Sequence, residues 1–327
     1  MATRRKFLSD SAWSAAALAL TPLAACSQER PPPAAPIQPA PPARPAPPAT
    51  PATGSMLMRS IPASGESIPA IGVGTSGSYE VGLDSAEFTA LQEVLKTFFD
   101  GGGRLIDTSP NYSNAEDVVG ALLAQGGWRD RCFLATKLAA DDQAALEQQW
   151  ADSKRRLRTG KVELLQVHNL RNMEQAWPYA RKLKEAGETK YIGLTHYVER
   201  GHADLARYMR EHKPDFVQIN YSVSAPQAAT TIFPLAQELG TAVIVNRAFD
   251  DGKLFAQVAD KPLPGWAAEA AIDSWAQLFL RFVLSHPAVT AVIPATGKPH
   301  RQADNLKGGA GALLTQAQQD EVVAMFK

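Results

Sequence analysis

Short apolar segments and amphipathic segments alternate along the chain from Met56 onward. The apolar segments are nearly continuous in hydrophobic character, which is typical of parallel strands covered on both faces. The segments between them have the apolar spacing of helices, and the first ends in glycine, a common helix stop. We expect strands at residues 68–75, 104–109, 132–137, 162–168, 191–196, 215–221, 241–247 and 288–296. We expect helices at 88–102, 115–125, 146–157, 177–187, 203–212, 233–240, 266–286 and 315–326.

This order of elements predicts the fold class. Eight strand–helix units in about 270 residues fit an α/β fold of the (β/α)8 type, the TIM barrel. A doubly wound parallel sheet is the alternative. The glycine pattern GxGxxG, which such a sheet uses to bind a dinucleotide, does not follow the first strand, so the barrel is favoured.

The first 25 residues have the composition of an export signal. A basic start leads into a short apolar run and then into small residues before Cys26. The run is too short to span a bilayer as a stable helix. TRRKFL (3–8) resembles the twin-arginine motif, and LAAC (23–26) resembles a lipobox, which implies cleavage before Cys26 and lipidation of its sulfur. An amphipathic helix is the alternative, but no polar stripe runs through the segment.

Residues 26–55 form a linker rich in proline and alanine, most densely at 31–52. Proline removes backbone donors, so we expect an extended spacer of polyproline type. The barrel then occupies residues 56–327. A lipid anchor, a spacer and a folded body predict a membrane-anchored periplasmic lipoprotein, and Ser27 after Cys26 favours the outer membrane. A cytoplasmic protein is the alternative.

Overall composition excludes several classes of function. The 33 basic and 33 acidic residues balance, so nothing indicates nucleic acid as a partner. Two cysteines, Cys26 and Cys132, cannot build a disulfide framework or a cysteine-based zinc site. The histidines lack the spacing of a metal site, and no metal is expected.

Chemically capable side chains follow the predicted strands at their carboxyl ends, where TIM barrels place their active sites. Each has a structural alternative, because an aspartate there often caps a turn, a lysine is often solvated, and a histidine is often only hydrogen-bonded. All of them nevertheless point to one end of the barrel. They are Asp107, Tyr112, Lys137, His168, Thr195, His196 and Gln218.

These residues carry a resemblance to the aldo-keto reductases, which covers roughly residues 56–327. LIDTSPNYSNAE is similar to the family segment Asp-Thr-Ala-x-x-Tyr-x-x-x-Glu, and ATK and QVH match its lysine and histidine segments. KEAGETKYIGLTHY and AVIPATGKPHRQADNL resemble its cofactor segments. The resemblance implies a nicotinamide cofactor and a small carbonyl substrate. It also implies a catalytic tetrad, Asp107, Tyr112, Lys137 and His168.

The chemistry of carbonyl reduction explains this set of residues. Hydride goes to carbon and a proton goes to oxygen, and we expect Tyr112 to supply the proton. Because free tyrosine has a pKa of about 10, we expect the Lys137 ammonium to lower the pKa of Tyr112. Asp107 would hold Lys137 in place, and His168 would donate a hydrogen bond to the carbonyl. A lipid-anchored, non-catalytic nucleotide-binding or redox-sensing barrel is the alternative.

The resemblance also implies the cofactor-binding residues. Thr195 and Gln218 would contact the nicotinamide amide. His196 replaces the family's asparagine, and the Arg247 guanidinium could stack where many members have an aromatic ring. Lys298 and Arg301 offer cations to a 2′-phosphate at the start of a helix, so we expect NADPH to be preferred over NADH. The full set is Gly74, Thr75, Thr195, His196, Gln218, Arg247, Thr296, Lys298, Arg301, Asp304 and Asn305.

The substrate and the oligomeric state do not follow from the sequence. Substrate pockets of this fold are built from variable loops. Tyr79, Trp128 and Tyr221 are candidate walls of such a pocket. An exported enzyme that meets no reduced nicotinamide pool is expected to be loaded with cofactor before export by the twin-arginine route.

Overall fold

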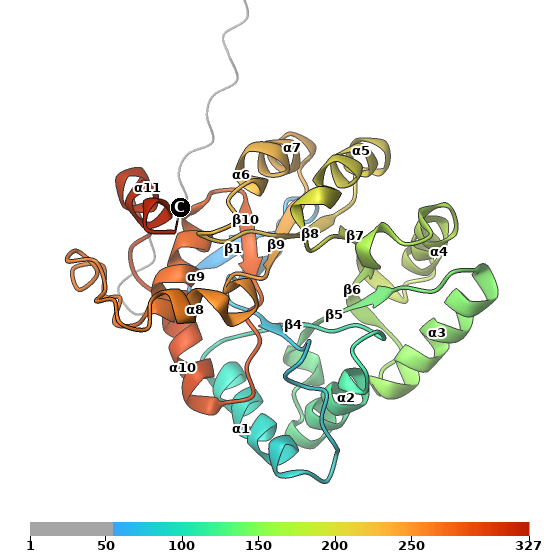
Figure 1. Ribbon diagram of the computed structural model, residues 1–327. Coiled ribbons are helices and arrows are strands. Elements are labelled where there is room, and N and C mark those ends of the chain that lie inside the picture. The colour runs from blue at the N-terminus through green and yellow to red at the C-terminus, as the bar shows by residue number, and fades with distance from the viewer. Residues whose placement is uncertain (1–54, 327) are drawn as a thin grey trace, which may run out of the picture. The chain divides into compact units, whose positions relative to one another are not determined.

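The computed structural model describes residues 55–326 (Figure 1). The predicted signal peptide, Cys26 and all of the predicted linker except Ser55 lie outside the described residues. Among the described helices, none has both the length and the hydropathy needed to cross a membrane.

Parallel strands form the centre of the fold, and helices surround them (Figure 1). Each strand pairs with the next one along the chain, from β3 to β10. Parallel bridges from Ile71 to Val292 and from Gly74 to Ala295 join the first strand to the last and close the barrel. The predicted TIM barrel is therefore confirmed, and the doubly wound alternative is wrong. The strands are β3 Val73–Gly74, β4 Leu105–Asp107, β5 Phe133–Leu138, β6 Val162–Val167, β7 Thr189–Thr195, β8 Phe216–Asn220, β9 Ala242–Asn246 and β10 Val289–Val292.

The α-helices follow the predicted order, with short additions. They are α1 Ala86–Asp100, α2 Ala115–Gly126, α3 Gln143–Arg156, α4 Met173–Glu185, α5 His202–His212, α6 Ala228–Thr231, α7 Phe233–Leu239, α8 Lys253–Gln257, α9 Trp275–Ser285, α10 Pro299–Gly308 and α11 Gln316–Ala324. Helix α10 follows the last barrel strand. The sequence predicted that a helix starts there but not where it ends.

The predicted long helix at 266–286 is wrong in its first half. Helix α9 starts at Trp275, because the Ser274 side chain accepts a hydrogen bond from the Gln277 backbone and caps the helix there. Residues 266–271 form turns, and Ala271 has a φ of 52°, which no α-helix contains. The apolar residues of this segment lie in turns that pack on the core. The helix was therefore wrongly predicted from their spacing alone.

A hairpin of two short strands, β1 (Met58–Ser60) and β2 (Ser67–Pro69), precedes the barrel. The predicted strand at 68–75 is therefore two strands, one in this hairpin and one in the barrel. Ile61 and Ile68 from the hairpin pack in one buried cluster with Leu105 and Phe133, which begin their barrel strands. The hairpin thus fills the amino-terminal end of the barrel and leaves the carboxyl end for the site.

Candidate active site

Side-chain alternation places the chemistry of the site inside the barrel. Successive residues of a strand point to opposite faces, so residues two apart share a face. In β5, Phe133 and Ala135 belong to the buried inner cluster, and Lys137 follows on the same face. The same two-residue step leads from Leu105 to Asp107 in β4. The barrel interior therefore changes from apolar to polar toward its carboxyl end.

The Asp107 carboxylate is the centre of this polar layer. Its Oδ1 accepts hydrogen bonds of 2.9 Å from the side-chain amides of both Gln166 and Gln218. Its Oδ2 accepts a hydrogen bond of 2.6 Å from Lys137 Nζ. Gln166 was not predicted from the sequence. Its signal was a polar residue inside the apolar run VELLQV, on the same strand face as the histidine two residues later.

Lys137 is fully buried and links the acid to the phenol. Besides Asp107, its Nζ donates a hydrogen bond of 2.7 Å to the Thr108 carbonyl. The same nitrogen lies 5.1 Å from the centre of the Tyr112 ring. Burial pulls the pKa of Lys137 down, but the charges and hydrogen bonds of Asp107 and Tyr112 outweigh it and leave the pKa raised. Lys137 is therefore a cation at neutral pH.

Tyr112 lies on the loop between β4 and α2. A turn from Ser109 to Tyr112 holds this loop, and Glu116 anchors the helix that follows by accepting hydrogen bonds from Thr136 and Ser153. Burial raises the pKa of Tyr112, and the Lys137 charge opposes the rise without cancelling it. The expected net lowering of the Tyr112 pKa is therefore wrong, and the phenol keeps its proton at neutral pH.

His168 directly follows β6, and its ring lies nearly perpendicular to the Tyr112 ring, with ring centres 5.8 Å apart. Its Nδ1 lies 3.1 Å from the Ser109 hydroxyl. Burial, together with the charges of Lys137 and Arg171, lowers the pKa of His168 to about 3. His168 is therefore a neutral imidazole at physiological pH. With it, all four predicted catalytic side chains meet at one end of the barrel.

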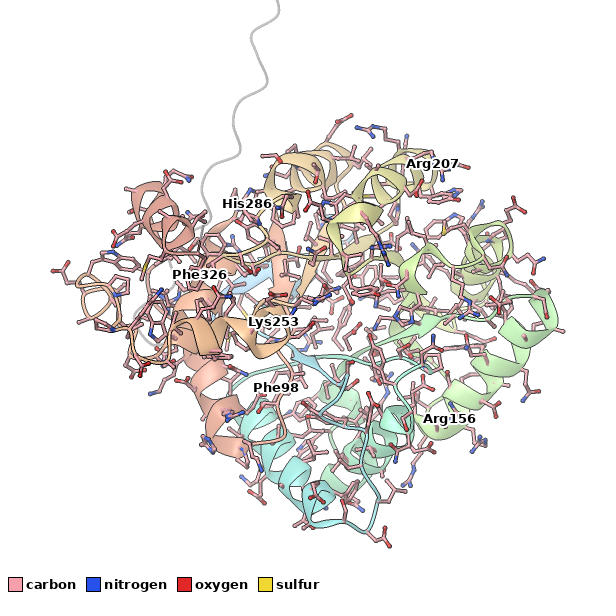
Figure 2. All side chains as sticks on the ribbon, viewed as in Figure 1. Phe98, Arg156, Arg207, Lys253, His286 and Phe326 are labelled. Atoms are coloured by element: carbon pink, nitrogen blue, oxygen red, sulfur yellow. The ribbon has the colours of Figure 1, made fainter. Side chains whose placement is uncertain are left out.

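A cavity of about 810 Å³ opens at this end. Such a volume lies in the range of small-molecule and cofactor sites. Helix α8, marked by Lys253 in Figure 2, contributes Phe255 to its wall. The lining residues are Gly74, Thr75, Ser76, Ser78, Asp107, Tyr112, His168, Asn169, Thr195, Tyr197, Gln218, Asn246, Arg247, Ala248, Phe249, Asp251, Gly252, Phe255, Ile293, Pro294, Ala295 and Arg301.

Six of the predicted cofactor-binding residues line the cavity: Gly74, Thr75, Thr195, Gln218, Arg247 and Arg301. At Gly74 a Cβ atom would lie only 2.7 Å from the Ile293 carbonyl, so glycine lets the first and last strands approach each other. Thr195 Oγ1 accepts a hydrogen bond of 2.9 Å from the Asn169 backbone. Arg247 forms an ion pair with Asp251 and lies over the Tyr197 ring.

The other predicted cofactor-binding residues lie outside the cavity lining: His196, Thr296, Lys298, Asp304 and Asn305. The His196 ring packs against Gly201 and accepts a hydrogen bond from the Val198 backbone. Asp304 accepts hydrogen bonds from Ser274 and Gln277 of the α9 start. Lys298 is exposed and directly precedes α10. It therefore lies at the amino-terminal end of that helix, where the helix dipole is positive.

The aromatic residues that line the cavity are not the three that we expected from the sequence. Tyr79 is fully buried, Tyr221 packs against Phe233, and Trp128 stacks on Phe99. None of the three candidates lines the cavity. Besides Tyr112 and His168, the aromatic lining comes from Tyr197, Phe249 and Phe255. Tyr197 and Phe249 lie on loops and Phe255 lies on the short helix α8, and the sequence pattern fixes the path of none of these segments.

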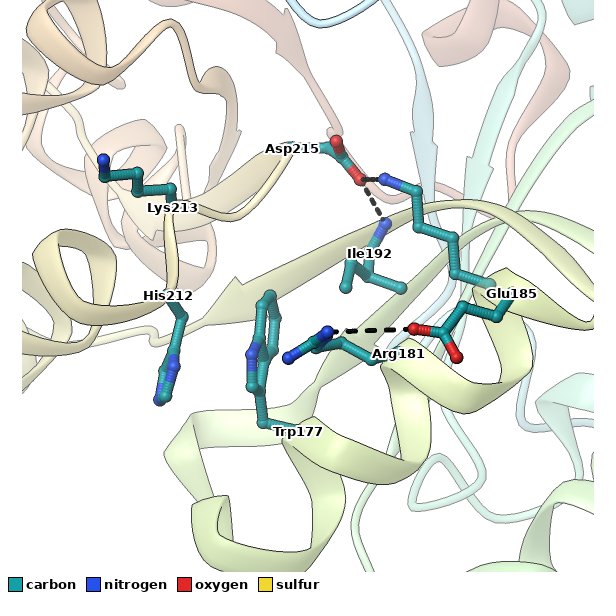
Figure 3. Close-up of a pocket in the computed structure, with 8 residues that line it drawn as sticks. Trp177, Arg181, Glu185, Ile192, His212, Lys213 and Asp215 are labelled. Atoms are coloured by element: carbon teal, nitrogen blue, oxygen red, sulfur yellow. Dashed lines mark hydrogen bonds and ion pairs between the residues drawn. The ribbon is translucent and has the colours of Figure 1, made fainter.

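A second hollow, of about 320 Å³, lies between α4 and α5 on the outside of the barrel (Figure 3). Its charges are mostly paired within it, since Lys184 bonds to Asp215 at 2.5 Å and Arg181 lies 3.7 Å from Glu185. Trp177 stacks on His212 at its side. The Trp177–His212 contact joins the two helices, and the paired charges leave this hollow without a feature that indicates a ligand.

Comparison with known proteins assigns the family. A model of the Aldo/keto reductase family matches residues 70–325, so the chain belongs to the aldo/keto reductase family. The chain is 31% identical to "Aldo-keto reductase YhdN" of Bacillus subtilis over 156 residues, which cover 42% of this chain and 46% of that protein. It is 27% identical to a "D-threo-aldose 1-dehydrogenase" of a Pseudomonas species over 234 residues, which cover 59% and 69%. The match thus spans about half the length of the first relative.

Solved structures share the fold. An aldo-keto reductase from Klebsiella pneumoniae, solved in complex with NADPH, has a TM-score of 0.70 at 21% identity, and the match covers 83% of this chain and 96% of that one. The holo form of an aldo-keto reductase from Bacillus halodurans has a TM-score of 0.68 at 21% identity, covering 83% and 97%. At this identity the likeness supports the barrel and leaves substrate and cofactor to the site itself.

Proposed function

We propose that this protein reduces an aldehyde or ketone to an alcohol with hydride from NADPH, and that Tyr112 is the general acid. One observation carries the proposal: the buried Lys137 ammonium bonds to Asp107 and lies 5.1 Å from the centre of the Tyr112 ring. A buried cation next to a phenol at a cavity wall favours proton donation from the phenol to a carbonyl, because it stabilises the phenolate that is left.

The four residues divide the work between them. Tyr112 gives its proton to the carbonyl oxygen as negative charge develops there, and the Lys137 cation stabilises the phenolate that remains. Asp107, fixed by Gln166 and Gln218, keeps Lys137 charged and in place. His168 is neutral and can donate one ring N–H to the carbonyl oxygen. The nicotinamide, when bound, supplies the hydride.

Features of the cavity fit a phosphorylated nicotinamide cofactor. Arg301 lines the cavity, and Lys298 lies close by in sequence at the start of α10. Both side chains are exposed, and neither forms an ion pair with any described residue. Free cations at a helix start favour a phosphate. The Klebsiella enzyme of the same fold was solved with NADPH bound, which supports the same choice.

The location of the protein is a second part of the proposal. The basic start, the apolar run and the LAAC segment support export and attachment to the membrane through a lipid on Cys26. Cell fractionation of the wild type and of Cys26→Ala tests this. A soluble wild-type protein in the cytoplasm would contradict the anchor, whereas release of only the variant from the membrane fraction supports it.

The catalytic proposal is tested by NADPH consumption with a reactive aromatic aldehyde, with wild type and Tyr112→Phe side by side. Methylglyoxal is a useful second substrate, because one relative is named methylglyoxal reductase. We expect Tyr112→Phe to lower kcat by about 10²- to 10⁴-fold and to leave NADPH binding intact. Near wild-type turnover in the variant would refute the role of Tyr112. NADPH binding without turnover in both proteins favours the non-catalytic alternative.

A further inference from the structure

Ser109 lies on the loop between β4 and α2 that also carries Tyr112, and it is fully buried. Its Oγ accepts a hydrogen bond of 3.2 Å from the Asn111 backbone N–H. The same oxygen lies 3.1 Å from His168 Nδ1. The hydroxyl therefore joins the Tyr112 loop to the histidine that follows β6.

Within the part of the chain that the structure describes, the Ser109 hydroxyl has one available hydrogen-bond acceptor. The Asn111 N–H is itself a donor, so it cannot receive the hydroxyl hydrogen. No other described residue hydrogen-bonds to the Ser109 side chain, which leaves His168 Nδ1 as its acceptor. A buried hydroxyl whose hydrogen has no acceptor is unfavourable, so this direction of the bond is favoured.

We infer that Ser109 is a positioning residue that fixes the tautomer of His168 by donating a hydrogen bond to Nδ1, so that the ring proton is on Nε2. A neutral imidazole has one donor nitrogen and one acceptor nitrogen, and the partner of one decides the role of the other. The low pKa of His168 agrees with a neutral ring.

The tautomer of His168 decides which hydrogen-bonding group faces the substrate. His168 lines the cavity, and its Nε2 makes no hydrogen bond to any described residue. Nε2–H is then the donor that is available to a carbonyl oxygen beside Tyr112. The opposite tautomer would present a lone pair to that oxygen and repel it. This inference rests on the proposed reductase function, since it concerns how the same site orients its substrate.

Nitrogen-15 spectra of the full chain, labelled at histidine, read the tautomer directly. The His168 signals are identified by their loss in His168→Gln. At neutral pH we expect the wild type to show a protonated Nε2 and an unprotonated Nδ1 at His168. In Ser109→Ala we expect a shift of His168 toward the Nδ1–H form. We also expect kcat/KM for the aldehyde to fall about tenfold, with the Kd for NADPH unchanged, as for one lost hydrogen bond.

Thr108→Val is the matched control for the spectra. Thr108 is the neighbouring residue, is fully buried, and its hydroxyl has no hydrogen-bond partner in the described part of the chain. Its replacement removes a buried hydroxyl without touching His168, and the His168 signals should remain those of the wild type. Loss of the signature in this variant as well would show that general disturbance of the loop moves the tautomer, and would overturn the inference.

The spectra test the role of Ser109, and the activity assay tests the proposed function, so either can be refuted without the other. A wild type with the proton on Nδ1, or a Ser109→Ala spectrum unchanged at His168, overturns the role of Ser109 even where the enzyme is active. A wild type with no NADPH-dependent turnover refutes the proposed function. The tautomer would then be set as inferred, but it would not serve carbonyl reduction.

Discussion

Lys137 Nζ lies 2.6 Å from the Asp107 carboxylate, and only 1% and 3% of the two side chains are exposed. Two opposite charges have thus been removed from water together. Their attraction is largely offset by the cost of desolvation, so the pair as a whole adds little stability. Removal of one partner is a different matter, because it leaves the other charge buried and unpaired.

We therefore predict a strongly non-additive pair of mutations. Lys137→Met should lower the free energy of unfolding by about 3–5 kcal/mol. Adding Asp107→Asn to that variant should restore a large part of the loss, since no buried charge remains. Urea unfolding of the wild type, both single variants and the double variant measures the coupling. Additive effects would show that the two charges are not coupled in the folded protein.

A second prediction concerns the packing of α2 against the end of α3. A Cβ atom at Gly120 would lie 2.1 Å from the Arg156 carbonyl oxygen, which is backbone and cannot rotate away. Gly120→Ala should therefore cost about 1–3 kcal/mol or more, although alanine favours helix. Thermal unfolding measures the loss. Gly160→Ala is the control, because no atom lies within 4 Å of a Cβ there, and it should unfold close to the wild type.

The cofactor preference gives a third prediction. Arg301 is exposed, lines the cavity and has no ion-pair partner among the described residues, so its charge is available to a 2′-phosphate. Arg301→Ala should raise the Kd for NADPH about tenfold and change the Kd for NADH little. Fluorescence titration measures both constants. Arg210→Ala removes an exposed positive charge from α5, away from the cavity lining, and should alter neither constant. An equal rise in the Kd for NADPH and in the Kd for NADH in Arg301→Ala would contradict a phosphate contact.

A fourth prediction concerns stability in acid. His286 packs against Phe233, and its Nδ1 accepts a hydrogen bond from the Ala288 backbone. Burial lowers the pKa of His286 from 6.5 to about 4. Below pH 6.5 the unfolded chain therefore binds a proton that the folded chain does not, so stability is lost as the pH falls from about 6.5 to about 4. Above pH 6.5 this residue contributes no pH dependence.

His286→Asn tests this, because its side-chain oxygen keeps an acceptor that cannot be protonated in this range. Free energies of unfolding at a series of pH values should fall less steeply between pH 6.5 and 4 in the variant than in the wild type. His168 adds a slope of the same sign in both proteins. Slopes that coincide would mean that folding does not lower the pKa of His286.

Most of the fold could be predicted from the sequence because parallel strands and amphipathic helices differ in period. The strand at 132–137 illustrates this, since β5 covers Phe133–Leu138 and every one of its side chains is buried. Prediction failed where local signals conflicted with packing. The apolar spacing of 266–286 suggested one helix, yet Ser274 provides a cap inside it. The hairpin before the barrel was missed because its strands span three residues each.

The aldo/keto reductase family was also predicted from the sequence and is confirmed. Asp107, Tyr112, Lys137 and His168 were found because each follows or ends a predicted strand. Gln166 was missed, because only the closed barrel shows that its amide and that of Gln218 bond to the same carboxylate oxygen. The walls of the cavity were missed because loop paths depend on packing.

The sequence by itself determined the order of strands and helices and the end of the barrel where the predicted catalytic side chains meet. These follow from side-chain periodicity and from the direction of parallel strands. The tertiary structure decided the electrostatics. Lys137 alone suggested a lowered pKa for Tyr112, but burial raises it, and burial also keeps His168 neutral. Desolvation depends on every atom that excludes water from a group, and those atoms come from strands far apart in the chain.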